Sequence, residues 1–352
     1  MLPKAERHKS LHRSLFNVGI SGITLTNSGN LIEPQWVEIT QHEISIANLP
    51  PAFEGFSIVQ LTDLHHSSIV TLDYLQACFQ QVVDLQPDLV VMTGDYINYQ
   101  EKYAQPVAQA IGETIVEAGI PTYAVLGNHD HWNSDWNDDW NDDSDASAFP
   151  LRNRWKGDGV EVINALTAGG IKVLMNESVL LQRGGDRLWL LGCGDLFAGN
   201  FDLECALGSL PSTDEPRFLL MHNPQPIESI AHHGFDLVLS GHTHGGQISL
   251  PFVPPKVGNK YLAGLFYVGA SRLYVCRGLG VTGVPIRFMT TPEIACFRLV
   301  RSSAVRSTTT NFPVQRNSRS AYYKRLERYT RLETASSKGW SVGVFSSNRS
   351  PL

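Results

Sequence analysis

The sequence predicts an α/β fold in which a mixed β-sheet is covered by helices, and two patterns support this prediction. In the first half of the chain, strand-like segments alternate with segments of helical periodicity, as in parallel strands joined by crossover helices. In the second half, strand-like segments follow one another closely, which indicates antiparallel pairing. A chain of 352 residues with 42% hydrophobic residues can bury a large core, which excludes disorder for most of its length.

Hydrophobic periodicity defines the elements of the first half. Trp36–Ile46 alternates apolar and polar residues like a half-buried strand. A helix is expected from the capping residue Thr71, with apolar residues at helical spacing, to the residue before Pro87. Asp88–Thr93 is apolar on both faces, as in a strand that is covered on both sides. The other expected elements are the strands Phe56–Leu61 and Thr122–Leu126 and a helix over Pro106–Ala118.

Short apolar segments in the second half are expected to be strands. The first three follow one another so closely that we expect them to be antiparallel; they are Ile171–Leu174, Ser178–Leu181 and Arg187–Gly192. The others are Phe218–Met221, Asp236–Leu239, Gln247–Leu250, Tyr274–Arg277 and Ile294–Leu299.

Charge divides the chain into an acidic body and a basic tail. The formal net charge is −6, but residues 301–352 carry ten Lys or Arg and two acids, a net +8, which leaves −14 for residues 1–300. An acidic body argues against a nucleic-acid-binding surface, apart from a possible nucleic-acid substrate. We expect a weakly structured extension over residues 1–35, one folded domain over 36–300 and a basic low-complexity extension over 301–352.

Two interpretations of the basic tail stay open. It is either a solvated extension, or a short amphipathic helix over Ala321–Leu332 rests on an anionic membrane surface. No apolar run approaches the roughly 18 residues that span a bilayer, and polar residues interrupt Leu15–Leu25, so an export signal is weak. The five cysteines form no CxxC pair, which favours reduced thiols. We therefore expect a cytoplasmic protein, with peripheral membrane contact through the tail as the open alternative.

Side chains of metal-binding type follow five of the predicted strands. In chain order they are Asp63-x-His65, Gly94-Asp95, Gly127-Asn128-His129-Asp130, His222 and Gly241-His242-x-His244. Ligands of open α/β sheets bind beyond the carboxyl ends of the strands, so we expect one shared site there. Taken singly, each histidine is more often a core residue than a ligand. Their joint order makes ligand roles the better interpretation.

This ordered set resembles the calcineurin-like metallophosphoesterase superfamily, over roughly residues 36–300. Further features resemble the bacterial YkuE/YaeI-like branch of phosphodiesterases, namely Gly245–Ile248, Arg277–Gly280, Pro285–Phe288 and Pro292–Ile294. The resemblance implies a four-layer α-β-β-α sandwich of two mixed sheets. It also implies an enzyme that hydrolyses phosphoesters.

The resemblance further implies a site that holds two divalent metal ions, either Mn, Fe or Zn. By the family pattern, Asp63, His65 and His244 hold one ion, Asn128, His222 and His242 hold the other, and Asp95 bridges them. A metal-bridging hydroxide then attacks the phosphorus in line. His129 assists the leaving group, and Asp130 holds the His129 imidazole. Two carboxylates against two dications leave positive charge for an anionic substrate.

The substrate stays open. A phosphodiesterase-like activity on a small molecule is the favoured interpretation. One alternative is a UDP-2,3-diacylglucosamine pyrophosphatase that acts on a lipid-linked precursor, because relatives of this branch are associated with that reaction. A third alternative, a metal-free interaction scaffold, is disfavoured because every expected donor position is filled.

Candidate substrate contacts lie beside the motifs, and they are His66, His131, Trp132, Trp136 and Arg277. After Trp132 the chain repeats the tetrapeptide Asp-Trp-Asn-Asp over residues 135–142. On a helix, tryptophans spaced by four would form an apolar stripe, which is either an ordinary surface feature or an apolar wall beside the metals. The six aspartates between residues 131 and 145 would repel a highly anionic ligand, which points to a diester or a single phosphate.

Overall fold

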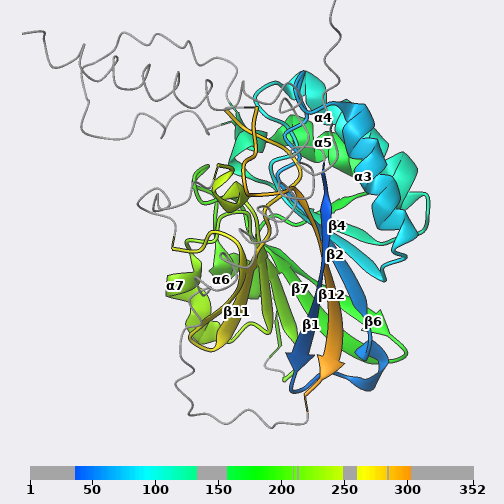
Figure 1. Cartoon of the computed structure of the whole chain (residues 1–352). Coiled ribbons are helices and arrows are strands. Elements are labelled where there is room, and N and C mark those ends of the chain that lie inside the picture. The colour runs from blue at the N-terminus through cyan, green and yellow to red at the C-terminus, as the bar shows by residue number, and fades with distance from the viewer. Residues whose placement is uncertain are drawn as a thin grey trace, which may run out of the picture. The chain divides into compact units, whose positions relative to one another are not determined.

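The computed structural model describes residues 36–132, 157–208, 210–211, 214–248, 260–283 and 285–302. The chain divides into two compact units, Met1–Thr310 and Asn311–Leu352, and all described residues belong to the first (Figure 1). The predictions for residues 1–35, for Trp136 and the tandem repeat, and for the basic tail beyond residue 302 lie outside the described residues. Within the described part, no helix has the length and hydrophobicity needed to cross a membrane.

The first sheet has six strands in the order β1-β12-β2-β3-β4-β5. Their bounds are Glu38–Ile46 for β1, Glu293–Arg301 for β12, Ser57–Leu61 for β2, Leu89–Thr93 for β3, Thr122–Val125 for β4 and Lys172–Val173 for β5. Strands β2, β3, β4 and β5 are parallel neighbours, whereas β12 runs antiparallel to β2 and parallel to β1. The sheet is therefore mixed.

The second sheet also has six strands, in the order β10-β11-β9-β8-β7-β6. Their bounds are Gly264–Val268 for β10, Ser271–Val275 for β11, Leu237–Ser240 for β9, Arg217–Leu220 for β8, Asp186–Gly192 for β7 and Glu177–Arg183 for β6. The four central strands are parallel, and an antiparallel hairpin closes each edge. Both sheets are mixed, as the sequence predicts.

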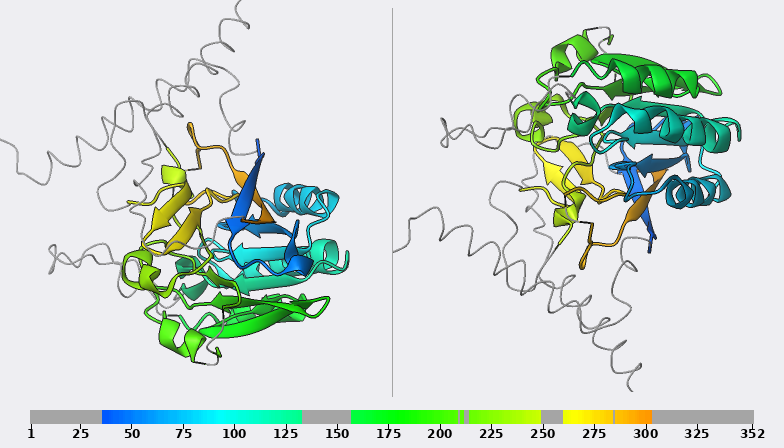
Figure 2. Two further views of the ribbon diagram at one scale, coloured as in Figure 1. Left: turned by 90° about the horizontal axis from the view of Figure 1, so that it is seen from below. Right: turned by 90° about the horizontal axis from the view of Figure 1, so that it is seen from above.

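The helices cover the outer faces of the two sheets (Figures 1 and 2). Their bounds are Leu72–Asp84 for α3, Ala104–Ile111 for α4, Val160–Ala168 for α5, Leu203–Leu207 for α6 and Ile227–Ile230 for α7. A π-helical turn over Gly112–Val116 continues α4. The Thr71 hydroxyl caps α3 by accepting a hydrogen bond from the amide of Tyr74, at 3.4 Å. The predicted start of this helix is thus confirmed.

Alternating side chains along the strands build separate apolar layers. In β3, Leu89 and Val91 belong to the core between the sheets, together with Phe218 and Leu220 of β8. Val90 faces the other way, into the core beneath α3, α4 and α5. A third apolar layer joins the outer face of the second sheet to α6 and α7. Because strand side chains alternate between faces, each sheet lies between two apolar layers, and the predicted four-layer sandwich is confirmed.

Two strand predictions are wrong. The segment around Ile171–Leu174 does not pair antiparallel with the strand after it, because β5 follows the crossover helix α5 and pairs parallel with β4. Residues 247–250 were expected to form a strand. In the described part of that segment, Ile248 makes only an isolated bridge to Phe288. Periodicity over such short runs does not reveal the pairing partner.

Candidate metal centre

The loops after β2, β3, β4, β8 and β9 bring the predicted ligands together. Three overlapping groups have ligand atoms within 4.8 Å of one another, and they are Asp63–His65–His244, His65–Asp95–His129 and Asp95–His222–His242. All of these residues are buried except His242, which is partly exposed. The fold therefore brings side chains that are distant in the chain to one site at the strand ends, as predicted.

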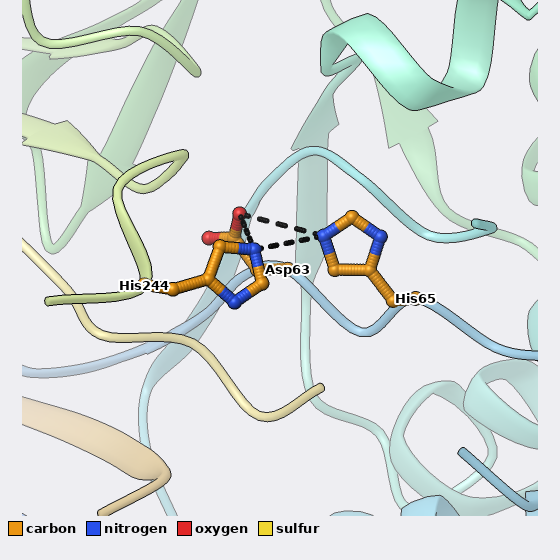
Figure 3. A group of neighbouring side chains, drawn as sticks. All are labelled: Asp63, His65 and His244. Carbon is orange, nitrogen blue, oxygen red and sulfur yellow. Dashed lines mark hydrogen bonds and ion pairs between the residues drawn. The ribbon is translucent and has the colours of Figure 1, made fainter. Parts of the chain in front are cut away.

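In the first group, the nitrogens of two imidazoles face a carboxylate (Figure 3). The Nε2 atoms of His65 and His244 lie 2.9 Å apart. The Asp63 Oδ1 atom lies 3.3 Å from the His244 Nε2 and 3.9 Å from the His65 Nε2. A cation in contact with all three atoms would satisfy them at once, whereas two neutral nitrogens facing each other can share only one hydrogen.

The third group, Asp95–His222–His242, also places imidazole nitrogens beside a carboxylate, and the amide oxygen of Asn128 lies next to it. The His242 Nδ1 lies 3.2 Å from the His222 Nε2 and 2.9 Å from the Asn128 Oδ1. The His222 Nε2 lies 3.2 Å from the Asp95 Oδ2. On its other side, the His222 Nδ1 donates a hydrogen bond to the carbonyl of Thr93, at 2.7 Å. This bond orients the ring with Nε2 directed at the cluster, as in metal-binding histidines.

The carboxylate of Asp95 lies between these groups. Its Oδ2 atom is 3.4 Å from the His65 Nε2 and 3.2 Å from the His222 Nε2. Its Oδ1 atom accepts a hydrogen bond from the amide of His129, at 2.8 Å. One carboxylate therefore reaches donors of both groups, which is the position that a bridging ligand requires.

The backbone of the site adopts an unusual conformation. Among the described residues, nine other than glycine have a positive φ, and five of them belong to the cluster: Asp63, His65, Asp95, His242 and His244. Such conformations cost free energy and are concentrated at functional sites. A side chain at position 127 would collide with the carboxylate of Asp95, so the glycine before Asn128 permits the close approach of the loops.

The electrostatics of the cluster favour bound cations. Burial alone would raise the pKa of Asp95, but His222 and His129 hold it well below its ordinary value. Burial alone would lower the pKa of His222, but Asp95 is foremost among the carboxylates that raise it to about 10. Burial and the neighbouring His222 lower the pKa of His242 to about 3. The carboxylates are thus ionised and draw positive charge toward themselves.

These observations test whether metal ions fit the residues present. Carboxylate, imidazole and amide oxygen donors, with no cysteine, suit Mn, Fe or Zn in a catalytic site. The donors are buried, face one another and include a carboxylate that reaches two groups. The residues therefore fit divalent ions.

His129 lies at the site, but Asp130 does not hold its imidazole as predicted. The His129 ring packs against the His65 ring, with centroids 4.7 Å apart, and its Nδ1 contacts the carbonyl of Asn98. The Asp130 oxygens instead accept hydrogen bonds from the amides of Asp95, Tyr96 and Gly127, each at 2.8 Å. Asp130 thus holds the loops after β3 and β4 together, because its carboxylate faces backbone amides.

The predicted substrate contact Arg277 is wrong. Its Nε donates to the Glu293 Oε2, at 3.1 Å, and its terminal nitrogen donates to the Glu38 Oε2, at 2.8 Å. The residue is buried, with 7% of its surface exposed. Two carboxylates that the sequence does not place beside it therefore hold this guanidinium, and it is not available to a substrate.

The other predicted substrate contacts divide into packed and accessible residues. The His66 Nδ1 contacts the carbonyl of Val70, at 2.9 Å, and the ring packs edge-on against Tyr103. The fully buried His131 has its Nδ1 3.1 Å from the carbonyl of Gly157. Both contacts favour packing roles. Trp132 is partly exposed, and its ring packs edge-on against Tyr99, with centroids 4.8 Å apart.

Sequence reasoning missed two aromatic residues at the site. Tyr99 packs against both His129 and Trp132, with ring centroids 5.0 and 4.8 Å away. Phe197 packs against His242, with centroids 5.0 Å apart. Tyr99 follows the Gly94-Asp95 motif closely enough to have been a candidate. Phe197 follows β7, after a Gly194-Asp195 pair that was not counted among the motifs.

A buried arginine was missed as well. The Arg287 side chain donates hydrogen bonds to the carbonyls of Arg277 and Gly280, at 2.8 and 2.6 Å. Its terminal nitrogen lies 3.3 Å from the His244 Nδ1. Arg287 therefore packs the segment after β11 against the turn that carries His244. The sequence shows it only as part of the Pro285–Phe288 feature.

Comparisons with known proteins agree with this geometry. A family model described as calcineurin-like phosphoesterase matches residues 56–246. The chain is 34% identical to the uncharacterized metallophosphoesterase YkuE of Bacillus subtilis over 276 residues, which cover 76% of this chain and 87% of that protein.

Two other relatives have names that state an activity. Phosphodiesterase YaeI of Escherichia coli is 28% identical over 300 residues, which cover 82% of this chain and all of that protein. UDP-2,3-diacylglucosamine pyrophosphatase LpxG of Chlamydia trachomatis is 30% identical over 310 residues, which cover 76% of this chain and 91% of that protein. The chain therefore belongs to the calcineurin-like phosphoesterase family of metal-dependent enzymes that hydrolyse phosphoesters.

Proposed function

We propose that the protein is a phosphodiesterase-like hydrolase that works with two divalent metal ions. The observation that carries the proposal is the position of Asp95, whose Oδ2 lies within 3.4 Å of a histidine nitrogen from each of two donor groups. A single ion would need only one of these groups. Two groups joined by one carboxylate support a pair of ions.

The ligand assignment follows the two groups. We assign Asp63, His65 and His244 to one ion, Asn128, His222 and His242 to the other, and Asp95 to both. The ions are Mn, Fe or Zn, because these accept mixed oxygen and nitrogen ligands. Bound there, they would polarise a phosphoryl group and lower the pKa of a water molecule, so that hydroxide exists near neutral pH.

His129 is proposed to assist the leaving group. The contact of its Nδ1 with the carbonyl of Asn98 fixes the ring beside His65. In that position, Nε2 would donate a hydrogen to the oxygen of the departing alcohol, on which negative charge develops. The Tyr99 ring packs against His129, the Trp132 ring packs edge-on against Tyr99, and the two rings form an aromatic wall on this side of the site.

A phosphodiester is the proposed substrate class. The relative YaeI is a phosphodiesterase by name, and it aligns over its whole length. A lipid-linked pyrophosphate is suggested only by the likeness to LpxG. No contact among the described residues favours that narrower substrate, so it enters the test as one compound of a panel.

The test combines metal analysis with hydrolysis of bis-p-nitrophenyl phosphate by the full-length chain. We expect close to two metal ions per chain after loading with Mn²⁺, and turnover that EDTA abolishes and Mn²⁺ restores. The matched control is Asp88→Asn, a half-buried carboxylate outside the cluster, which should retain both metals and turnover. Activity that survives complete removal of metal would contradict the proposal. A panel of monoesters, diesters and UDP-2,3-diacylglucosamine then ranks the substrates.

A further inference from the structure

An exposed aromatic ring lies against one of the proposed metal ligands. Phe197 has 43% of its surface exposed, and its ring meets the His242 ring edge-on, with centroids 5.0 Å apart. Leu196, the residue before it, is 36% exposed. A single exposed apolar residue is common on protein surfaces and needs no explanation by itself. The contact with a ligand of the site is what distinguishes this one.

The loop that carries Phe197 is held in place by hydrogen bonds at both of its ends. The Asn176 Oδ1 accepts from the amide of Gly194, at 2.8 Å, and from the amide of Asp202, at 3.0 Å. The loop between these two amides is therefore closed by one side chain. This anchoring limits the cost of ordering the loop when a substrate binds.

Hydrogen bonds also fix the residues on either side of Phe197. The Asn223 Oδ1 accepts from the amide of Leu196, at 2.9 Å, and the Asp195 Oδ1 accepts from the amide of Ala198, at 2.7 Å. Asn223 directly follows the cluster residue His222. The backbone around Phe197 is thus tied to the strand end that carries His222, which keeps the residue next to the site.

The ring contacts of the site form two separate sets. One set joins His129 to His65 and Tyr99. The other joins His242 to His222 and Phe197. In an in-line displacement the leaving oxygen departs opposite the attacking hydroxide, and the retained alcohol group is one of the three equatorial substituents, so with His129 on the leaving-group side the retained group can extend along the other set of rings. An apolar ring there offers a packing surface that contributes binding free energy only for groups large enough to reach it.

We propose that Phe197 is a specificity-determining contact for the retained alcohol group of a phosphodiester, and that it favours groups with an aromatic or extended apolar surface. This inference rests on the proposed function and names the part of the substrate that the site selects. A nucleoside base and an alkyl chain share this chemistry. Asn223 and Asn176 are positioning residues, because they act through the loop and not on the substrate.

The test uses esters with one common leaving group. Phenyl, octyl, thymidine 5′ and methyl p-nitrophenyl phosphates all release p-nitrophenol and differ only in the retained group. For the Mn²⁺-loaded full-length protein, the ratio of kcat/KM for the phenyl ester to that for the methyl ester measures the contact. We expect Phe197→Ala to lower this ratio about tenfold, mainly through KM, and Phe197→Leu to lower it by less. Tyr267→Ala is the matched control, because Tyr267 is 48% exposed on the edge strand β10 and should leave the ratio unchanged.

Asn176→Ala tests the positioning role with the same ratio. We expect it to lower the phenyl-to-methyl ratio severalfold while the metal content of the protein stays constant. A change in stability alone would affect both esters equally and leave the ratio at the wild-type value.

Binding measurements separate failure of this inference from failure of the proposed function. Calorimetric affinities for phenylphosphonate and methylphosphonate give the same comparison without turnover, and we expect Phe197→Ala to weaken only the preference for phenylphosphonate. Equal ratios in wild type and Phe197→Ala, in both hydrolysis and binding, would overturn the role of Phe197. Absence of hydrolysis of every ester would overturn the proposed function, while the binding ratio would still decide the role of Phe197. The octyl and thymidine esters then show whether a chain or a base is preferred.

Discussion

Two clusters of charged and polar side chains, each built around buried residues, differ in how far the protein itself satisfies them. The first is the metal-type cluster of seven donors at the strand ends, Asp63, His65, Asp95, Asn128, His222, His242 and His244. The second, here called the Arg277 network, consists of Arg277, Glu293, Glu38, Tyr274 and His42. Both lie where elements of the two sheets meet.

The Arg277 network pairs each charge with an opposite one. The guanidinium of Arg277 reaches the carboxylates of Glu293 and Glu38, at 3.1 and 2.8 Å. The Tyr274 hydroxyl donates to the Glu293 Oε1, at 2.6 Å. Burial alone would lower the pKa of Arg277, but the two glutamates raise it. Opposite charges with complete hydrogen bonding stabilise the contact between β11, β12 and β1.

The metal-type cluster instead places like donors against one another. The Nε2 atoms of His65 and His244 lie 2.9 Å apart, and neither lysine nor arginine forms an ion pair with Asp63 or Asp95 among the described residues. The comparison teaches that burial of charge by itself does not indicate function. Buried donors of the same kind that face each other, such as the nitrogens of His65 and His244, do indicate it.

The largest expected effect is a loss of bound metal, which distinguishes the metal-type cluster from the Arg277 network. Asp95→Asn removes the carboxylate that reaches both donor groups, so we expect the protein to lose metal and turnover to fall by more than about 10³-fold. Elemental analysis and bis-p-nitrophenyl phosphate hydrolysis measure both quantities. Full metal content with full activity in this variant would place Asp95 outside the metal site. After metal removal, the free energy of unfolding of Asp95→Asn should differ from that of the wild type by less than that of the Glu293→Gln variant described below.

The next effect separates chemistry from metal binding within the cluster. His129→Ala should lower kcat by roughly 10² to 10⁴, because the leaving group loses its partner, while about two metals per chain remain. Matched elemental analysis of the variant decides between the two roles, since loss of both metals would make His129 a ligand. His233→Ala, at a site far less buried, serves as the control and should retain activity.

A smaller effect should appear in the Arg277 network, and it concerns stability. Glu293→Gln leaves the Arg277 guanidinium buried with a weaker partner, so we expect the free energy of unfolding to fall by about 3 kcal/mol. Urea unfolding of the EDTA-treated protein measures this change, and a separate Mn²⁺-loaded sample of the variant should hold as much metal as the wild type. Glu228→Gln breaks an exposed ion pair with Lys260 and should change little. Loss of metal from Glu293→Gln without loss of stability would contradict the stabilising role of the Arg277 network.

The same variant has a defined pH dependence. Burial alone would raise the pKa of Glu293, but Arg277 outweighs burial, and the pKa lies below its ordinary value. A carboxyl whose pKa is lower in the folded state stabilises the fold above its unfolded pKa of about 4.3. This stabilisation is lost as the pH falls through the folded pKa. The difference between wild type and Glu293→Gln should therefore be constant near neutral pH and shrink below about pH 4. A difference that grows on acidification would contradict the assignment.

Much of the site could be predicted from the sequence because metal coordination depends on residue type. The motifs around Asp63, Asp95, Asn128 and His242 carry the donors that divalent ions accept, and each follows an apolar strand. The residues at the edge of the site could not be predicted in the same way. Phe197 lies in no motif, and Arg277 lies in a family-like feature that does not reveal its partners, so their roles depend on which neighbours they meet.

The sequence by itself determined the α/β fold, the position of most strands and the donor set, because hydrophobic periodicity and ligand chemistry are local properties of the chain. Only the tertiary structure decided that β5 pairs with β4, that Asp130 binds backbone amides, and that Arg277 is held by Glu293 and Glu38. These contacts join segments that are up to 239 residues apart. Strand pairing and the facing of the two sheets set which side chains meet there, and periodicity along the chain does not encode that choice.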